Sequence, residues 1–405
     1  MKRTLILAAL ATLGLAAPAC LAEKPADEKK ADVQSVAKSN NRFAVELYGR
    51  LREKDGNLFF SPYSIETALA MTYAGARGET AEQMAKTLHY DLPNDREHAA
   101  FAALIKQINA PGEKRGYQLS TANALWTQKD YPFAADFLKL TKDNYGAEAK
   151  EVDFNGATEQ ARKTINAWVE KQTQEKIKDL LPKGSLTVNT RLVLTNAIYF
   201  KGDWASQFKK DRTKNETFRA GDKKIDAPFM SQKQKFGYAE DDALQVLEMP
   251  YVGKELSMVV LLPKKADGLA DLEKALTADK LAAWFGRLRE RETEVTLPKF
   301  KTTVEFELSD TLAKMGMPVA FTARADFSGM NGGKGSLSIS KVIHKAFVDV
   351  NEEGTEAAAA TGVVVEPKAA KVNPVFRADH PFVFLVRDKR SDSILFLGRI
   401  VDPTK

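Results

Sequence analysis

Histidine, cysteine and serine are the side chains that most often carry catalysis, and their pattern in this chain forms no enzyme motif. The four histidines, His89, His98, His344 and His380, show no metal-ligand spacing such as H-E-x-x-H. The single cysteine, Cys20, lies in an N-terminal targeting segment, so no thiol nucleophile remains for the body of the chain. No G-x-S-x-G motif is present. We therefore expect neither an enzyme nor a metal or cofactor site.

Two other patterns are candidates for binding phosphate or nucleic acid. The run 332–336 is rich in glycine but lacks the spacing of a phosphate-binding loop, which favours a surface turn. The basic clusters 209–212 and 223–224 contain no interleaved aromatic residues and are typical of a solvated face. The net charge of +6 is modest for 405 residues. We expect no nucleic-acid partner.

Residues 1–22 are typical of a signal peptide, with a basic start and an apolar run too short to cross a membrane comfortably. Two processing routes fit the small residues near its end. Cleavage after Ala19 or Ala22 would release the protein, whereas Cys20 resembles the acylated cysteine of bacterial lipoproteins and would anchor the protein to a membrane. Either route predicts export, to an extracellular, periplasmic or lipid-anchored location.

The remaining chain divides into a short tether and one large domain. Residues 23–35 are rich in charge, alanine and proline and predict a disordered tether. Residues 36–405 contain no repeat, long linker or composition break. The early part is mainly helical, and an apolar run at 191–200 is typical of a strand covered on both faces. The chain ends in a predicted hairpin, so we expect a single α+β domain.

Local signals place several helix starts. Ser61 before Pro62 predicts a capped helix with proline at its first position. The sequences beginning at Thr80 and Asn94 resemble capping boxes and predict two further helix starts.

The stretch 352–368 is the most unusual part of the sequence, because Ala357–Ala360 lie between flexible glycine-containing pairs. As a strand, it would place Thr355 and every second residue up to Val365 on one uncharged face. All of its charges after Thr355 and before Pro367 fall on the opposite face. Two interpretations fit: a surface linker, or a mobile loop able to become a central strand without burying an ion.

From about 40 to 404, several separate stretches resemble the serpin family, in the order in which that family carries them. These stretches are Asn57–Ser64, Ala68–Met71, Gly75–Thr80, Asn196–Trp204, Asp326–Met330, His344–Ala346, Pro381–Phe382 and Phe396–Arg399. The run 352–361 is similar to the hinge of the reactive loop in the same family. Each stretch alone is only weakly specific for the family, but together and in this order the stretches make a strong resemblance.

The resemblance implies an α+β serpin fold, with three β-sheets, eight or nine helices and an exposed reactive-centre loop at about 352–374. It also implies an inhibitor of serine-type endopeptidases that is consumed as a suicide substrate: the protease cuts the loop, becomes acylated, and is trapped when the loop inserts as a new strand in a five-stranded sheet. The protein would be a monomer. A non-inhibitory serpin (carrier or chaperone) and an inhibitor of a cysteine protease are the alternatives.

The family spacing, counted from Glu352, places the reactive bond at Lys368–Ala369, which would suit a trypsin-like protease. Counting back from Pro381 points nearer Ala370, and Lys371, Ala369 and Val365 are rival cleavage sites. The hinge implied by the resemblance consists of Glu352, Gly354, Thr355, Glu356, Ala357, Ala358, Ala359, Ala360 and Thr361.

The resemblance also implies a group of residues that control opening of the sheet. Ser61, Ser64, Asn196 and His344 would form a polar cluster that hydrogen-bonds across the two strands that must part. Trp204 would lie at the top of the sheet, where insertion begins. The structural alternatives are a satisfied core histidine for His344 and core packing for Trp204.

Overall fold

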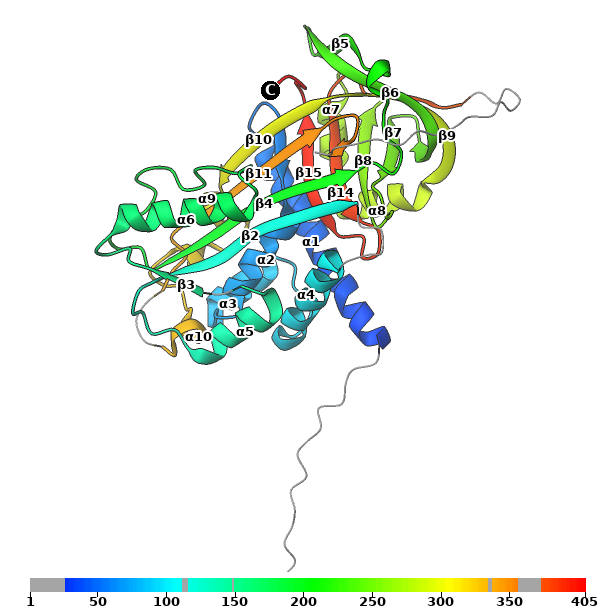
Figure 1. Cartoon of the computed structure of the whole chain (residues 1–405). Coiled ribbons are helices and arrows are strands. Elements are labelled where there is room, and N and C mark those ends of the chain that lie inside the picture. Colours follow the sequence, from blue (N-terminus) through cyan, green and yellow to red (C-terminus); the bar gives the residue numbers. More distant parts are fainter. Residues whose placement is uncertain (1–25, 111–115, 148, 334–336, 356–372) are drawn as a thin grey trace, which may run out of the picture.

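The computed structural model of this chain describes residues 26–110, 116–147, 149–333, 337–355 and 373–405 (Figure 1). These residues form ten α-helices, two short 3-10 helices and fifteen strands in two hydrogen-bonded sheets. The mixture confirms the predicted α+β class. Eight or nine helices were expected, and the shortest of the ten contains only four residues.

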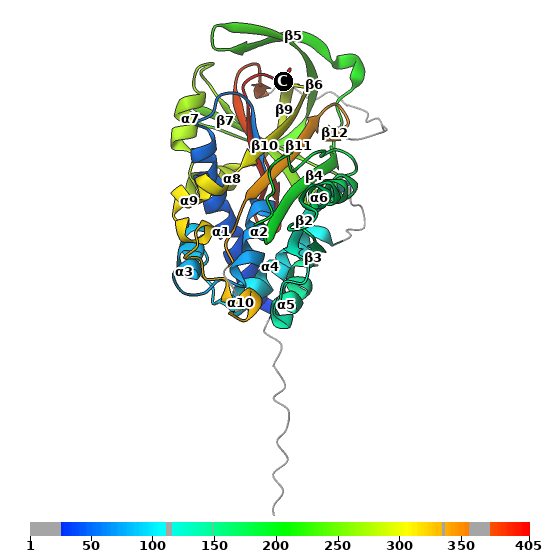
Figure 2. The same cartoon turned by 90° about the vertical axis from the view of Figure 1, so that its left-hand side faces the viewer.

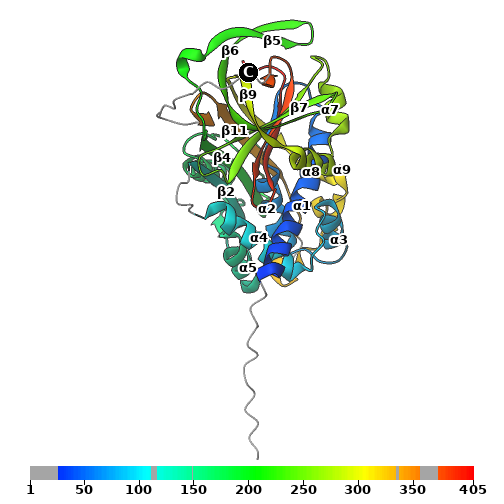
Figure 3. The same ribbon diagram turned by 90° about the vertical axis from the view of Figure 1, so that its right-hand side faces the viewer.

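The helices lie mainly at one end of the molecule and along the outer faces of the sheets. They are α1 (Ala26–Leu51), α2 (Pro62–Tyr73), α3 (Gly78–Thr87), α4 (Asn94–Asn109), α5 (Ala135–Tyr145), α6 (Thr158–Gln172), η1 (Lys210–Arg212), α7 (Leu269–Ala275), α8 (Ala278–Arg287), α9 (Ser309–Met315), η2 (Pro318–Phe321) and α10 (Ser328–Asn331). In the view of Figure 3, α2, α4 and α5 lie below the sheets.

The larger sheet contains nine strands, eight along its path and one at its side. Its order is β1 (Leu58–Phe60), β15 (Ile394–Ile400), β14 (Phe382–Asp388), β8 (Leu256–Pro263), β7 (Leu244–Pro250), β6 (Lys223–Glu240), β9 (Arg289–Pro298) and β13 (Val375–Arg377), with β5 (Lys214–Ala220) beside β6. The long strand β6 pairs with β5 and β9 over most of its length and with β7 at its end. Hydrogen bonding through β6 therefore joins two of the three expected sheets into one.

The smaller sheet carries the candidate site. Its order is β10 (Phe300–Glu307), β11 (Val342–Val350), β12 (Gly354–Thr355), β4 (Leu192–Asp203), β2 (Tyr117–Gln128) and β3 (Ala149–Val152). Figure 2 shows α6 lying along this sheet beside β2 and β4. Ile165 and Val169 of α6 are fully buried there, and they belong to a second hydrophobic core between the helix and the sheet. Strand β4 includes all but the first residue of the predicted run 191–200 and is buried on both faces through Phe200, as expected.

Two local predictions about the N-terminal half are wrong. Residues 26–35, assigned to a disordered tether, form the start of α1, because Val33 and the residues after it pack into the main core. The helices α3 and α4 begin before the expected capping boxes, and no side chain caps either of them. The cap at Ser61 is confirmed, since its Oγ accepts a hydrogen bond from the Ser64 amide at 3.1 Å. Within the described residues, no helix combines the length and apolar character needed to cross a bilayer.

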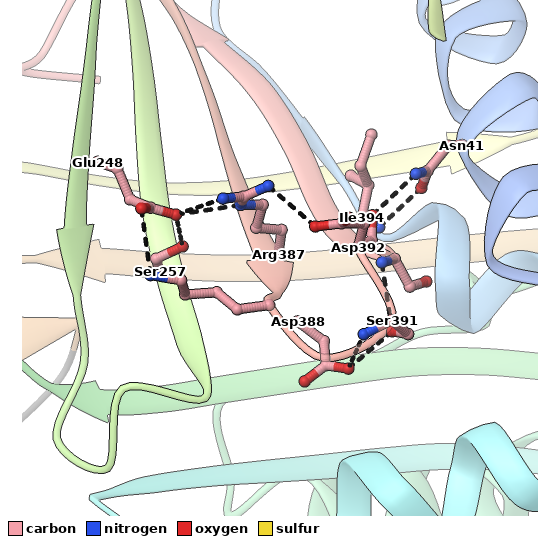
Figure 4. Close-up of polar contacts among 10 residues, drawn as sticks. Asn41, Glu248, Ser257, Arg387, Asp388, Ser391, Asp392 and Ile394 are labelled. Atoms are coloured by element: carbon pink, nitrogen blue, oxygen red, sulfur yellow. Dashed lines mark hydrogen bonds and ion pairs between the residues drawn. The ribbon is translucent and has the colours of Figure 1, made fainter. Parts of the chain in front are cut away.

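The predicted closing hairpin is confirmed and is held by a buried polar network (Figure 4). Arg387 of β14 donates to Glu248 of β7 at 2.7 Å, and Ser257 of β8 donates to the same carboxylate at 2.8 Å. At the turn, Ser391 donates to Asp388 at 2.7 Å. The hairpin and its neighbours β7 and β8 are therefore joined by side chains as well as by their backbones.

Candidate functional site

The smaller sheet is partly open next to the parallel pairing of β4 with β11. Leu194–Tyr199 of β4 lie opposite Val342–Phe347 of β11, and we call this pairing the seam. Beyond it the two strands diverge and β12 lies between them. Thr355 pairs with Val350 on one side and with Gly202 on the other, antiparallel to both strands. A strand that continued from β12 would run down the seam, because its neighbours already have the required direction.

The two residues of β12 fit this position closely. A Cβ atom on Gly354 would lie 2.0 Å from the Gly202 carbonyl oxygen, so only glycine allows the backbones to approach this closely. Thr355 is fully buried, and its hydroxyl lies 2.8 Å from the Tyr251 hydroxyl. Burying a threonine hydroxyl costs little when it has a hydrogen-bond partner, which Tyr251 provides.

Trp204 holds the segment that leads into β12. Its indole Nε1 donates to the Asn351 carbonyl at 3.0 Å, and its amide donates to the Glu353 carbonyl at 3.0 Å. The indole stacks on the Tyr251 ring, with ring centroids 4.7 Å apart. Trp204 therefore lies at the open end of the seam, apart from the other four residues of the expected sheet-opening group.

Two glutamates attach the start of the hinge to the rest of the molecule. The Glu352 carboxylate is buried, accepts a hydrogen bond from Thr213 at 2.7 Å and forms an ion pair with Lys299 at 2.9 Å. Burial alone would raise the pKa of Glu352, but the bonds from Lys299 and Thr213 outweigh it and lower the pKa. Glu353 forms a more exposed ion pair with Lys210 at 2.7 Å. The hinge is therefore fixed up to Thr355.

The other four predicted residues come together beneath the seam. His344 of β11 and Asn196 of β4 are in register, and His344 Nδ1 bonds to Asn196 Oδ1. The Asn196 amide nitrogen lies 2.8 Å from Ser64 Oγ, at the start of α2. The Ser61 amide donates to His344 Nε2 at 3.0 Å, and Ser61 Oγ donates to the Leu395 carbonyl at 2.6 Å. The cluster thus ties the seam to α2 and to β15.

The protonation state of His344 follows from these bonds. Nε2 accepts from an amide, so the proton must be on Nδ1, where it is donated to Asn196. Burial lowers the pKa of His344 to about 3, although its bond with Asn196 opposes the shift. The cluster is therefore neutral around pH 7, and parting the strands would separate hydrogen-bonded dipoles and no ions.

The sequence analysis missed two residues of this site. Asn123 of β2 accepts hydrogen bonds from Ser64 Oγ at 3.1 Å and from the Asn196 amide at 2.9 Å, so the polar cluster has five members. An asparagine within an otherwise strand-like run was a usable signal for it. Tyr251, the partner of Thr355 and Trp204, follows a strand and carries no comparable signal.

Several predicted residues lie outside the described part of the chain. These are the hinge residues Glu356, Ala357, Ala358, Ala359, Ala360 and Thr361, the reactive-bond candidates Val365, Lys368, Ala369, Ala370 and Lys371, and the lipidation candidate Cys20. Among the residues that are described, no group of three or more His, Cys, Asp or Glu is arranged to hold a metal ion.

Comparison with known proteins gives a consistent result. The family model for Serpin (serine protease inhibitor) matches residues 38–403. A leukocyte elastase inhibitor from Bos taurus is 47% identical over 382 residues, covering 92% of this chain and 100% of that protein. An uncharacterized serpin-like protein from Thermococcus kodakarensis is 42% identical, covering 93% of this chain and 87% of its own. The crystal structure of uncleaved ovalbumin superposes with a TM-score of 0.83 at 32% identity, covering 91% of this chain and 100% of ovalbumin. The chain, whose strand β12 lies between β4 and β11, therefore belongs to the serpin family.

Proposed function

We propose that this protein inhibits a serine protease as a suicide substrate: the protease cuts the loop after Thr355, is acylated, and is trapped when the cut loop inserts along the seam. One observation carries the proposal. β12 already lies between β4 and β11, antiparallel to both, with Thr355 buried and hydrogen-bonded. Insertion would continue an existing pairing, and the face that enters carries no charge from Thr355 to Val365.

Distance supports the trap. A loop of about fourteen residues at ~3.3 Å each would extend roughly 45 Å as a strand, enough to carry a protease from one end of a domain to the other. Displacement and distortion of the protease would spoil the close geometry that its deacylation requires. One inhibitor molecule would be consumed for each protease molecule trapped, and the inhibitor would catalyse no reaction.

The reactive bond is proposed to be Lys368–Ala369, which would be cut by proteases with a carboxylate in their specificity pocket. The relative from Bos taurus is named as an elastase inhibitor, and Val365, Ala369 or Ala370 would suit an enzyme that prefers small apolar residues. The choice between these sites decides the class of target.

A panel of purified proteases tests the whole proposal. The full-length protein is mixed with trypsin, elastase, subtilisin and papain. A band that survives denaturant and contains both chains is expected for at least one serine protease. The mass of the released C-terminal peptide identifies the cut, and a peptide starting at Ala369 is expected with trypsin. Cleavage without a stable band would contradict the proposal and favour a non-inhibitory carrier or chaperone. A stable band with papain alone would reassign the target to cysteine proteases.

We also propose that the protein is exported, on the basis of its N-terminal segment. Mass spectrometry of the N-terminus, in a host that processes exported proteins, distinguishes the routes. Acylation at Cys20, lost in Cys20→Ser, indicates a lipid anchor, whereas a free N-terminus after Ala19 or Ala22 indicates release. An intact Met1 in the mature protein would rule out both.

A further inference from the structure

A group of buried polar atoms without partners lies among the helices at the end opposite β5. Glu66 of α2 and Glu97 of α4 are each only 1% exposed. Both carboxylate oxygens of Glu66 and one of Glu97 make no hydrogen bond to any described residue. The Tyr90 hydroxyl and His98 Nε2 are buried and unpaired in the same way. Five such atoms gathered on neighbouring elements are unusual, because buried polar groups nearly always have partners.

No positive charge compensates the two carboxylates among the described residues. Arg96, next to Glu97 in the sequence, forms its ion pairs with Asp32 and Glu28. The charges that act on Glu97 come from Asp32 of α1 and from Asp91, both acidic, and Glu97 itself acts on Glu66. Two neighbouring buried carboxylates without a cation cannot both be ionised cheaply. At least one of them must therefore hold a proton.

The surroundings of the pair are aromatic, which strengthens this conclusion. Tyr73 of α2 packs edge-on against Tyr90, with ring centroids 5.2 Å apart, and Tyr90 packs in the same way against Phe101 at 5.7 Å. Tyr145 of α5 closes the group through its bond to His98 Nδ1 at 2.5 Å. The titratable groups that face the carboxylates are thus tyrosines, one histidine and acids.

We propose that Glu66 and Glu97 form a proton-binding pair that controls how long the folded chain keeps its seam closed. Ser61 and Ser64 anchor the start of α2 to the polar cluster, and Glu66 lies in the next turn of the same helix. While the pair holds a proton, α2 packs against α1 and α5 without an uncompensated charge. When the pair ionises, the buried charge weakens that packing, and the helix that supports the seam is loosened.

The direction of the pH effect follows from proton binding. Burial raises the pKa of Glu97 to about 7, and burial together with the charge of Glu97 raises the pKa of Glu66. The folded chain then holds more protons than the unfolded chain above about pH 4.5, so its stability falls as pH rises. His98 acts in the opposite sense between about pH 4 and pH 6.5, because burial lowers its pKa to about 4. Above about pH 6.5, therefore, the loss of stability caused by the glutamates is not offset by His98.

The test measures loss of the native monomer and needs no protease. Full-length protein is warmed at pH 6.5, 7.5 and 8.5, and the surviving monomer is followed on native gels. The rate at which the wild-type monomer is lost is expected to rise on the order of tenfold across this range. A change of one pKa unit between two states corresponds to a factor of about ten in their equilibrium constant. Glu66→Gln, which is neutral at position 66 at every pH, is expected to show a flatter profile and slower loss at pH 8.5, and the double variant Glu66→Gln/Glu97→Gln a nearly flat one. Glu82→Gln, an exposed glutamate on α3, serves as the matched control and should follow the wild type.

Infrared spectroscopy provides a direct readout of the proton. The wild-type protein at pH 6.5 should show the carbonyl band of a protonated carboxylic acid in a dry environment. Glu66→Gln and Glu97→Gln should each weaken this band, and the double variant should lose it. If Glu66→Gln does not fold, Glu97→Gln and the wild-type spectrum still decide the matter. A wild type without this band, or with a pH profile matched by both Gln variants, overturns the proposal. Neither outcome bears on the inhibitory function, because no protease is involved.

Discussion

Buried polar side chains join strands both at the closing hairpin and at the seam, and these two places use opposite chemistry. At the closing hairpin, an ion pair between Glu248 and Arg387 reaches across β8, and both side chains are 8% exposed. At the seam, the link between His344 and Asn196 is neutral and is supported by two serines of α2. Removing one partner from a buried ion pair leaves a charge in the interior, whereas hydrogen-bonded dipoles can exchange one partner for another. The neutral contacts of the seam would thus suit the strand separation that the proposed insertion requires, whereas the ion pair of the hairpin would resist separation.

The most drastic way to test the seam is to put a charge where the loop enters. Thr355→Arg should abolish the stable protease complex while leaving binding and cleavage intact, since a charged side chain cannot replace a fully buried threonine. The measurement is the yield of denaturant-resistant complex against cleaved inhibitor. Glu356→Arg is the control, because the strand alternation places residue 356 on the opposite face. A Thr355→Arg variant that traps protease as well as the wild type would refute insertion along the seam.

The next largest effect is expected at the hairpin. Arg387→Met leaves the buried Glu248 with only the more exposed Lys389 as its cation, 3.2 Å away, and should lower the free energy of unfolding by about 3 kcal/mol. The effect should appear equally in the intact and the loop-cleaved protein, since the hairpin keeps its pairing in both. Urea unfolding of the two forms provides the measurement. Lys139→Ala, which breaks an exposed pair with Asp143, should cost less than about 1 kcal/mol. A cost confined to the intact form would show that the hairpin takes part in opening.

Acid should act on the seam through His344. Because the pKa of His344 is lowered to about 3, the folded chain binds fewer protons than the unfolded chain, and stability falls as pH drops below about 6.5. This residue alone should remove about 2 kcal/mol between pH 8 and pH 5. His344→Gln should remove that part of the acid sensitivity, and His89→Gln, near the surface, should leave it unchanged. Identical urea midpoints against pH for wild type and His344→Gln would contradict the assignment.

The smallest effect is expected at the entry of the loop. Tyr251→Phe keeps the stacking on Trp204 but removes the hydroxyl that bonds to Thr355, which should cost about 0.5–1.5 kcal/mol. We expect β12 to leave the sheet more readily, seen as faster proteolysis near Thr355 by an enzyme that is not inhibited. Tyr238→Phe, whose hydroxyl bonds to Gln245 away from the seam, should not change that rate.

Much of this arrangement was predictable from the sequence, for definable reasons. The run 191–200 is apolar on both faces, which identified a covered strand, and Ser61 before Pro62 identified a helix start. Neither signal depends on distant parts of the chain. The polar residues of the cluster could be proposed only through family resemblance, because Ser64, Asn196 and His344 are far apart in the sequence and meet only in the folded sheet.

The failures come from tertiary contacts, which local sequence does not reveal. Residues 26–35 have the composition of a disordered segment, but contacts made by Val33 and Val36 with the core outweigh composition. The proximity of Glu66 to Glu97 left no trace in the sequence, because a glutamate on a helix is ordinarily solvated and only tertiary packing buries these two. Both the helical structure of residues 26–35 and the burial of the two glutamates depend on contacts with distant parts of the chain, and residue type alone does not predict them.

The helix α1 also bears on how the molecule would be presented at a surface. It contains 26 residues, about 39 Å of helix, and it begins at the end of the molecule opposite the β5 strand (Figures 1 and 3). β12, from which the loop departs, lies in the half nearer β5 (Figure 2). If Cys20 is acylated, the N-terminal end of α1 would face the membrane. β12, where the predicted reactive loop begins, would then lie in the half of the molecule farther from the membrane, accessible to proteases in solution. The continuous helix α1 would then hold the sheets away from the membrane surface.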